Sequence, residues 1–144
     1  MRKIYVASSW DNPYQALVVK MLREAGHEIY DFKNPGHGRC EFSWKYVSPT
    51  WREWSPQEYR ASFDHPRAVS GFLNNFNAMT RATECLILCP SGRSSHIEAG
   101  YMSGNGKTVI ALMIENQEPE LMYACFNQIL IGWEEFKSYY NVPE

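Results

Sequence analysis

The 144-residue sequence has few cysteines, almost no net charge and no long hydrophobic run. Four cysteines, none in a zinc-like cluster with other cysteines or histidines, favour reduced thiols and predict neither a metal nor a cofactor. A formal net charge of −2 argues against a nucleic-acid polymer as the partner. No apolar stretch approaches the ~18 residues of a membrane span, and the first one is too short for a signal peptide. We therefore expect a cytoplasmic protein that does not bind a membrane.

The chain does contain alternating strand-like and helix-like segments, the pattern of an α/β protein. Hydrophobic residues make up 44% of the sequence, and its length suits one domain, so we predict a single domain over residues 1–144. Helical patterns separate the strand-like runs, and such an order predicts a parallel sheet of about five strands with helices on both faces. The expected strands are residues 4–7, 27–32, 86–89, 108–114 and 129–131. The expected helices are residues 14–25, 68–82, 94–103, 118–125 and 133–139.

Residues 33–66 interrupt this alternation. Several prolines and glycines lie among three tryptophans, Trp44, Trp51 and Trp54, and no regular period is visible. A connection of this length inside a compact domain is usually functional or disordered, and the aromatic content argues against disorder. We interpret the segment as an ordered excursion with short helical turns that lies over one end of the sheet.

Ligands of open α/β sheets bind beyond the carboxyl ends of the strands, which directs attention to residues 8–12 and 90–95. In the second loop, Gly92 allows close approach of the backbone, and Ser94 or Ser95 is expected to cap the following helix. The start of that helix and Arg93 together suit an anion or a hydroxyl-rich ligand. Glu98 has a simpler interpretation as the acid of a capping box, and His96 as a surface or packing residue.

The run Gly-Arg-Ser-Ser-His-Ile-Glu-Ala-Gly-Tyr at residues 92–101, Tyr5 in the first strand and Gly106-Lys107 before a later strand resemble the nucleoside 2-deoxyribosyltransferase family. The order of elements is similar along essentially the whole chain, including residues 71–79 and 118–123. The resemblance implies a flavodoxin-like, Rossmann-like three-layer sandwich. It also implies that the protein is an enzyme that breaks the N-glycosidic bond of a deoxynucleoside or deoxynucleotide. A further implication is a homo-oligomer, dimeric or larger, in which a neighbouring subunit closes each site.

The resemblance assigns roles to individual residues. Glu98 attacks the anomeric carbon and forms a glycosyl ester, and Tyr5 holds that carboxylate in line, unless Tyr5 is simply a packed strand residue. Trp10 or a tryptophan of the excursion stacks on the base, unless these rings only pack together. The implied substrate-binding set is Ser8, Ser9, Trp10, Gly92, Arg93, Ser94, Ser95 and His96.

The sequence departs from the family at the position whose side chain assists departure of the base. Many members carry an aspartate in the helix before the third strand, whereas this chain has Asn74-Asn75 and no acid between Arg67 and Glu84. Asn75, the third expected catalytic residue, can bond a base but cannot protonate it. Three possibilities follow: another acid, such as His96 or Asp64, supplies the proton; only easy leaving groups depart; or a ligand is bound without turnover.

Three functions remain open at this stage. The first is an N-glycosyltransferase or N-glycosidase acting on a small nucleoside or nucleotide, with Arg93 and the serines favouring a 5′-monophosphate. The second is a non-catalytic protein on the same fold that sequesters or senses a nucleotide. The third is a protein-interaction domain, suggested by the tryptophan-rich excursion.

Overall fold

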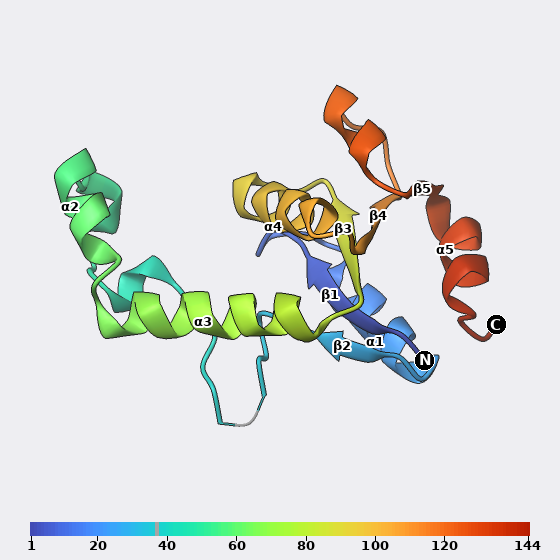
Figure 1. Cartoon of the computed structure of the whole chain (residues 1–144), viewed down its shortest axis with the longest axis horizontal. Helices are drawn as coiled ribbons and strands as arrows, with labels where there is room; N and C mark the ends of the chain where they lie inside the picture. Colours follow the sequence, from blue (N-terminus) through green and yellow to red (C-terminus); the bar gives the residue numbers. More distant parts are fainter. Residues whose placement is uncertain (37) are drawn as a thin grey trace. The chain divides into compact units, whose positions relative to one another are not determined.

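The computed structural model describes residues 1–36 and 38–144 (Figure 1), and these form two compact units. The first unit joins residues 1–31 to residues 81–144, and the second comprises residues 32–80. None of the helices in these residues is long and apolar enough to span a membrane.

The first unit is built on a five-stranded sheet in which every neighbouring pair of strands is parallel. The strand order is β2-β1-β3-β4-β5, so β1 and β3 lie side by side. After its first residue, each of the three central strands is made of buried or half-buried apolar residues, as expected for a parallel sheet covered on both faces. The strands are β1 (Lys3–Ala7), β2 (Glu28–Tyr30), β3 (Glu84–Cys89), β4 (Thr108–Met113) and β5 (Gln128–Ile131).

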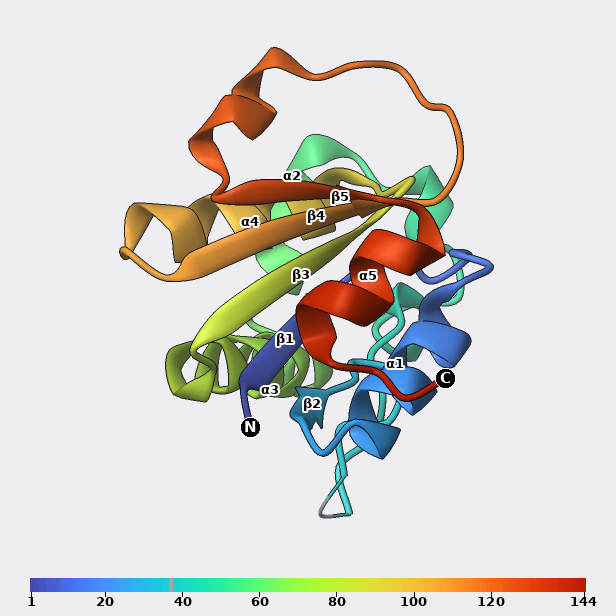
Figure 2. The same ribbon diagram turned by 90° about the vertical axis from the view of Figure 1, so that its right-hand side faces the viewer.

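Three helices cover the sheet of the first unit. The helices α1 (Gln15–Glu24) and α5 (Gly132–Tyr140) lie on one face, and α4 (Arg93–Gly104) lies on the other (Figure 2). Between the sheet and the first pair of helices, Leu22, Leu86 and Phe136 are fully buried. The α/β class, the parallel sheet of five strands and the three layers are therefore confirmed.

The second unit contains the tryptophan-rich excursion, which is ordered in short turns as predicted. Trp44 makes T-shaped contacts with four aromatic rings, with centroid distances of 4.9 Å to Phe42, 5.7 Å to Trp54, 6.0 Å to Tyr59 and 6.4 Å to Phe63. Trp44 and Trp54 are thus packing residues of this unit. Its helical segments are η1 (Trp44–Tyr46), η2 (Trp51–Glu53), α2 (Pro56–Ser62) and α3 (Pro66–Arg81), the last ending one residue beyond the unit.

The helix expected at residues 118–125 is wrong. The segment contains only the 3₁₀ turn η3 (Leu121–Cys125), which begins after Pro119. The Glu120 side chain accepts a hydrogen bond from the Met122 N–H at 3.0 Å, and Phe126 already has an extended backbone. Five residues between these two points leave no room for a regular α-helix, and short connectors of this kind are typically 3₁₀.

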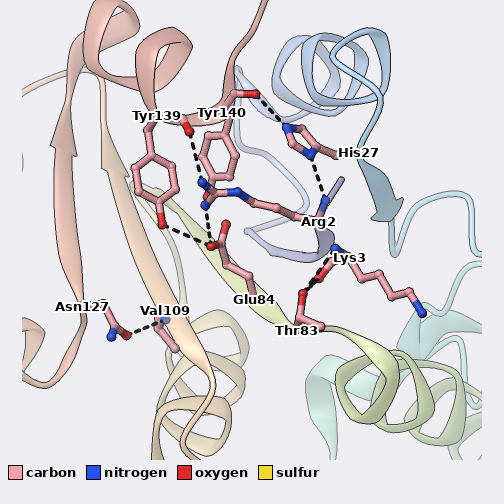
Figure 3. Close-up of polar contacts among 9 residues, drawn as sticks. All are labelled: Arg2, Lys3, His27, Thr83, Glu84, Val109, Asn127, Tyr139 and Tyr140. Atoms are coloured by element: carbon pink, nitrogen blue, oxygen red, sulfur yellow. Dashed lines mark hydrogen bonds and ion pairs between the residues drawn. The ribbon is translucent and has the colours of Figure 1, made fainter.

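A polar cluster fastens the chain ends to the amino-terminal edge of the sheet (Figure 3). Arg2 forms an ion pair of 2.9 Å with the buried Glu84, and its guanidinium also donates to the Tyr139 carbonyl oxygen at 3.3 Å. Tyr139 donates a further hydrogen bond of 3.2 Å to Glu84. His27 bridges the Arg2 amide and the Tyr140 carbonyl oxygen. This edge is opposite to the carboxyl ends of the strands, so the cluster stabilises the unit away from the site.

Candidate active site

Tyr5 and Glu98 meet at the face of the sheet that α4 covers. The Tyr5 hydroxyl of β1 donates a hydrogen bond to Glu98 Oε2, which projects from the second turn of α4. The Tyr5 ring is buried beneath this contact. The two residues lie 93 positions apart in the sequence, so the fold itself brings them together. A phenol that bonds one carboxylate oxygen leaves the second oxygen for a reacting atom.

Tyr30 supports this contact from the neighbouring strand. It is the register partner of Tyr5 in the β1–β2 pair, and the two rings stack with centroids 5.4 Å apart and planes 13° from parallel. Cross-strand neighbours in register point to the same face, which is why the rings meet. The stack limits the movement of the Tyr5 ring and therefore the position of its hydroxyl.

Burial controls the ionisation of Glu98. The pKa of its carboxyl is raised from 4.5 to about 8, because burial penalises the charged form. No Arg or Lys contributes to this pKa to offset the effect of burial. A carboxyl with a strongly perturbed pKa beside a specific partner is a typical feature of a functional site.

The loops after β1 and β3 are bonded to each other. The side-chain amide of Asn12 donates to the carbonyl oxygens of Leu88, at 3.1 Å, and Pro90, at 3.0 Å. The Gly92 N–H donates to Ser9 Oγ at 2.6 Å, and a Cβ atom at Gly92 would lie 3.2 Å from that oxygen. Gly92 therefore permits the close approach of the two loops, and Ser9 is used in holding them together.

The expected cap of α4 is wrong in detail. Gly92 is the N-cap residue, and no side chain caps the helix, so Ser94 and Ser95 lie within the first turn. Ser94 and Arg93 are exposed, whereas Ser95 is buried. Neither serine satisfies the free N–H groups at the helix start, because each side chain sits beyond the cap position. These donors and the positive end of the helix dipole remain available at the site.

Two hydroxyl groups near this helix start are buried without a partner among the described residues. They are Ser8 Oγ, just after β1, and Ser91 Oγ, just before Gly92. Ser8 is only 8% exposed. A buried hydroxyl without a hydrogen bond costs about 1–3 kcal/mol, so such a pair at the carboxyl ends of two adjacent strands is suited to a polar ligand.

His96 is a structural residue of this site. Its Nδ1 lies 2.7 Å from the Gly92 carbonyl oxygen, and its Nε2 lies 2.8 Å from the Tyr123 hydroxyl. A carbonyl only accepts, so Nδ1 carries the hydrogen and, in the neutral ring, Nε2 accepts from Tyr123. The two rings also stack, with centroids 5.6 Å apart. His96 thereby fastens η3 to the start of α4.

Two further residues of the predicted site are Trp10 and Asn75. Trp10 follows β1 and is 51% exposed. Asn75 lies on α3, in the second unit, and its role stays a prediction. The described residues contain no group of three His, Cys, Asp or Glu side chains close enough to hold a metal ion.

Four contributors were not predicted as site residues. Tyr30 and Tyr123 lie in segments whose sequence indicates only secondary structure or the family resemblance, whereas Ser91 and Asn12 lie in the two loops where a ligand is expected. Asn12 follows a buried strand, where an amide side chain can bond two backbones, and that position was the available signal. Tyr123 and Tyr30 are found only through the tertiary contacts that place them.

Comparisons with known proteins support the fold. No protein-family model matches the chain, and no curated protein matches it either. Among solved structures, the chain is similar to a 2-deoxyribosyltransferase from the psychrotolerant bacterium Bacillus psychrosaccharolyticus, with a TM-score of 0.69, 18% identity, and 94% of this chain and 90% of that chain covered. It is also similar to the Clostridium botulinum CMP N-glycosidase BcmB, with a TM-score of 0.50, 16% identity, and 96% and 95% covered. The chain thus has the fold that the 2-deoxyribosyltransferase has, as the sequence resemblance implied.

Proposed function

We propose that this protein cleaves the N-glycosidic bond of a 2′-deoxynucleoside 5′-monophosphate, with Glu98 as the nucleophile. The observation that carries the proposal is the hydrogen bond from the Tyr5 hydroxyl to the Glu98 carboxylate, beside the open start of α4. The two similar solved structures are those of a 2-deoxyribosyltransferase and a CMP N-glycosidase, which supports this class of reaction.

The proposed reaction has two steps. A Glu98 oxygen bonds to the anomeric carbon while the bond from that carbon to the base nitrogen breaks and its electron pair leaves with the base. Water, or a ring nitrogen of a second base, then attacks the same carbon and loses its proton to solvent, the ester bond breaks to release the Glu98 carboxylate, and the departed base takes up a proton from solvent. Tyr5 holds the carboxylate in line in both steps, and two inversions give net retention of configuration.

A phosphate of the substrate would explain the polar groups that the fold leaves unbonded. The backbone donors at the start of α4 and the Arg93 guanidinium suit an anion. The unpartnered hydroxyls of Ser8 and Ser91 supply two further donors. We therefore place a 5′-phosphate, rather than a bare 5′-hydroxyl, at this helix start.

The leaving base receives little help from acids in this chain. Both ring nitrogens of His96 are already bonded, to Gly92 and Tyr123, so His96 is not the proton donor. The family resemblance assigns the base to Asn75, and an amide can hydrogen-bond a base but cannot protonate it. Bases that leave easily, such as those with an electron-poor ring, are therefore the expected substrates.

A second function has one observation in its favour. A Glu98 pKa of about 8 keeps that carboxyl mostly protonated at neutral pH, and a protonated carboxyl is a poor nucleophile. On this basis the same site would bind a nucleotide without cleaving it, as a sequestering or sensing protein.

Turnover assays separate the two functions. The protein is incubated with single deoxynucleosides and with their 5′-monophosphates, with and without a second free base, and released or exchanged base is followed by chromatography. We expect release from the monophosphates, with kcat/KM rising about tenfold per pH unit below pH 8 as Glu98 ionises. Base exchange identifies a transferase, and release into water identifies a hydrolase.

Matched variants assign the roles. Glu98→Ala is expected to lower kcat at least 10³-fold, and Tyr5→Phe about 10–100-fold through loss of one charge-assisted hydrogen bond. Asn75→Asp is expected to accelerate release of poor leaving bases, and the exposed Glu118→Gln serves as the control with unchanged rates. The binding function would be correct, and the enzyme function wrong, if the unaltered protein and all variants bind nucleotide without turnover. In that case Glu98→Ala should change the affinity only slightly.

A further inference from the structure

The Glu98 carboxyl lies among uncharged groups. Its Oε2 accepts a hydrogen bond from the Tyr5 hydroxyl, and the Tyr5 ring stacks on Tyr30. No charged side chain in the described part of the chain contributes to the pKa of Glu98, which burial raises to about 8. At pH 7 the resting site therefore holds a mostly neutral carboxyl, whereas the nucleophile has to be a carboxylate. A ligand that brings a positive charge would ionise Glu98 on binding.

Little in the site can protonate a departing base. Both ring nitrogens of His96 are already bonded, and the sequence has no acid between Arg67 and Glu84. A second ionised carboxyl beside Glu98 would raise its pKa by repulsion, and no such contribution is present among the described residues. A neutral base keeps the electron pair of the broken bond and leaves as an anion, which is slow without a proton donor.

We propose that the base of the substrate is a ring with a fixed positive charge, of which a pyridinium is the simplest. This inference rests on the proposed function and names its substrate class. When the bond from the anomeric carbon to such a ring breaks, its electron pair neutralises the ring, so the base departs as a neutral molecule and takes up no proton. Glu98 gives its proton to solvent as the charged ring binds and then attacks as a carboxylate. It is released when water attacks the ester and loses a proton to solvent.

The distances in such a complex are short enough for the charge to act on Glu98. A nucleophile poised to attack lies about 3–3.5 Å from the reacting carbon, so the glycosidic nitrogen is within ~5 Å of the carboxylate. An opposite charge at ~4–6 Å lowers the pKa of a carboxyl by about 1–3 pH units, which brings that of Glu98 to 7 or below. Binding of the substrate and activation of the nucleophile then occur together.

Trp10 adds an aromatic group suited to the same charge. It lies in the loop after β1, which Ser9 and Asn12 bond to the loop after β3, and it is half exposed. The face of an indole ring attracts a cation through its quadrupole, and it does so more strongly than a phenol or phenyl ring. A tryptophan at the border of the site therefore favours a charged base over a neutral one.

Turnover of charged and neutral bases tests the proposal. The 2′-deoxynucleoside 5′-monophosphate of nicotinamide, a pyridinium, is compared with the four common deoxynucleotides, and each kcat/KM is divided by the rate of spontaneous hydrolysis. We expect this ratio to be about 10²-fold higher for the pyridinium, because a general acid that only the neutral bases need contributes at least that factor. N7-methyl-deoxyguanosine monophosphate at pH 6, with the unmethylated nucleotide as its reference, distinguishes an alkylated purine from a pyridinium as the source of the charge.

Binding is measured separately, with two carbocyclic nucleotides that cannot be cleaved and differ only in charge, one carrying nicotinamide and the other benzamide. Calorimetry at pH 7 in buffers of different ionisation enthalpy should show about one more proton released by the charged analogue than by the neutral one. Glu98→Gln should abolish that release and weaken the charged analogue about tenfold, with little effect on the neutral one. The exposed Glu118→Gln is the control and should behave as the unaltered protein.

The outcomes separate this inference from the proposed function. Equal normalised rates for charged and neutral bases would overturn the inference and leave the proposed function intact. No release from any nucleotide would refute the proposed function, and the charged base would then stand or fall with the binding comparison. Equal affinities of the two analogues, with no difference in proton release, would overturn it.

Discussion

Ionisation of Glu98 should make the free energy of unfolding fall as the pH rises, and replacing Glu98 by glutamine should remove most of that fall. The carboxyl has a pKa of 4.5 in the unfolded chain and about 8 in the folded one, so the folded state holds its proton longer. Stability therefore falls as the pH rises from about 4.5 and stops falling above 8. Each unit of pKa is worth 1.36 kcal/mol, which gives a total loss of about 4–5 kcal/mol. Glutamine keeps the oxygen that Tyr5 bonds but does not ionise.

Thermal unfolding of both proteins between pH 5 and pH 9 measures this effect without requiring any activity. The difference in melting temperature, variant minus unaltered protein, should grow by about 10–15 °C across that range for a chain of this size. Glu118→Gln, at an exposed position, is the control and should follow the unaltered protein. A difference that stays constant with pH would refute the argument that burial raises the pKa of Glu98.

Three further predictions concern the contacts around the site and those at the opposite ends of the strands. Arg2→Met should lower the free energy of unfolding in urea by about 2–3 kcal/mol, because Glu84 is left charged in a buried position. Adding Glu84→Gln should recover part of this loss, and an Arg2→Met variant as stable as the parent would contradict the prediction. Asn12→Ala should cost about 2 kcal/mol in the same assay and lower turnover, because two carbonyls lose their donor; unchanged stability would show that the tie is unimportant. Tyr123→Phe should cost about 1 kcal/mol through loss of the bond to His96, and the His96 side-chain NMR signals should move; unaltered signals would argue against the contact.

Most of the sheet could be predicted from the sequence because its signals are local. The runs of buried residues in β1, β3 and β4 and the positive φ of 88° at Gly26 after α1 follow from composition and periodicity. The segment at residues 118–125 could not be predicted, because its apolar residues mimic helical spacing while Glu120 and Phe126 limit it to one short turn.

The site was predicted in part, for a similar reason. Tyr5 and Glu98 were paired through the family resemblance, and the structure places them in contact. Serine is favoured at N-cap positions, which predicts Ser94 or Ser95 as the cap, but the structure has Gly92 there, with its N–H donating to Ser9 Oγ. That approach joins residues 83 positions apart, and no local pattern carries it.

The bridge that Asn12 makes between the two site loops also affects how a ligand binds. Since Asn12, in the loop after β1, is already bonded to Leu88 at the end of β3 and to Pro90 just after it, these two loops do not need to order when a ligand arrives. Binding then loses little conformational entropy of the backbone, and more of the contact energy appears as affinity. The two loops are in this sense preorganised for binding. Amide hydrogen exchange in both loops should therefore be slow before any ligand is added.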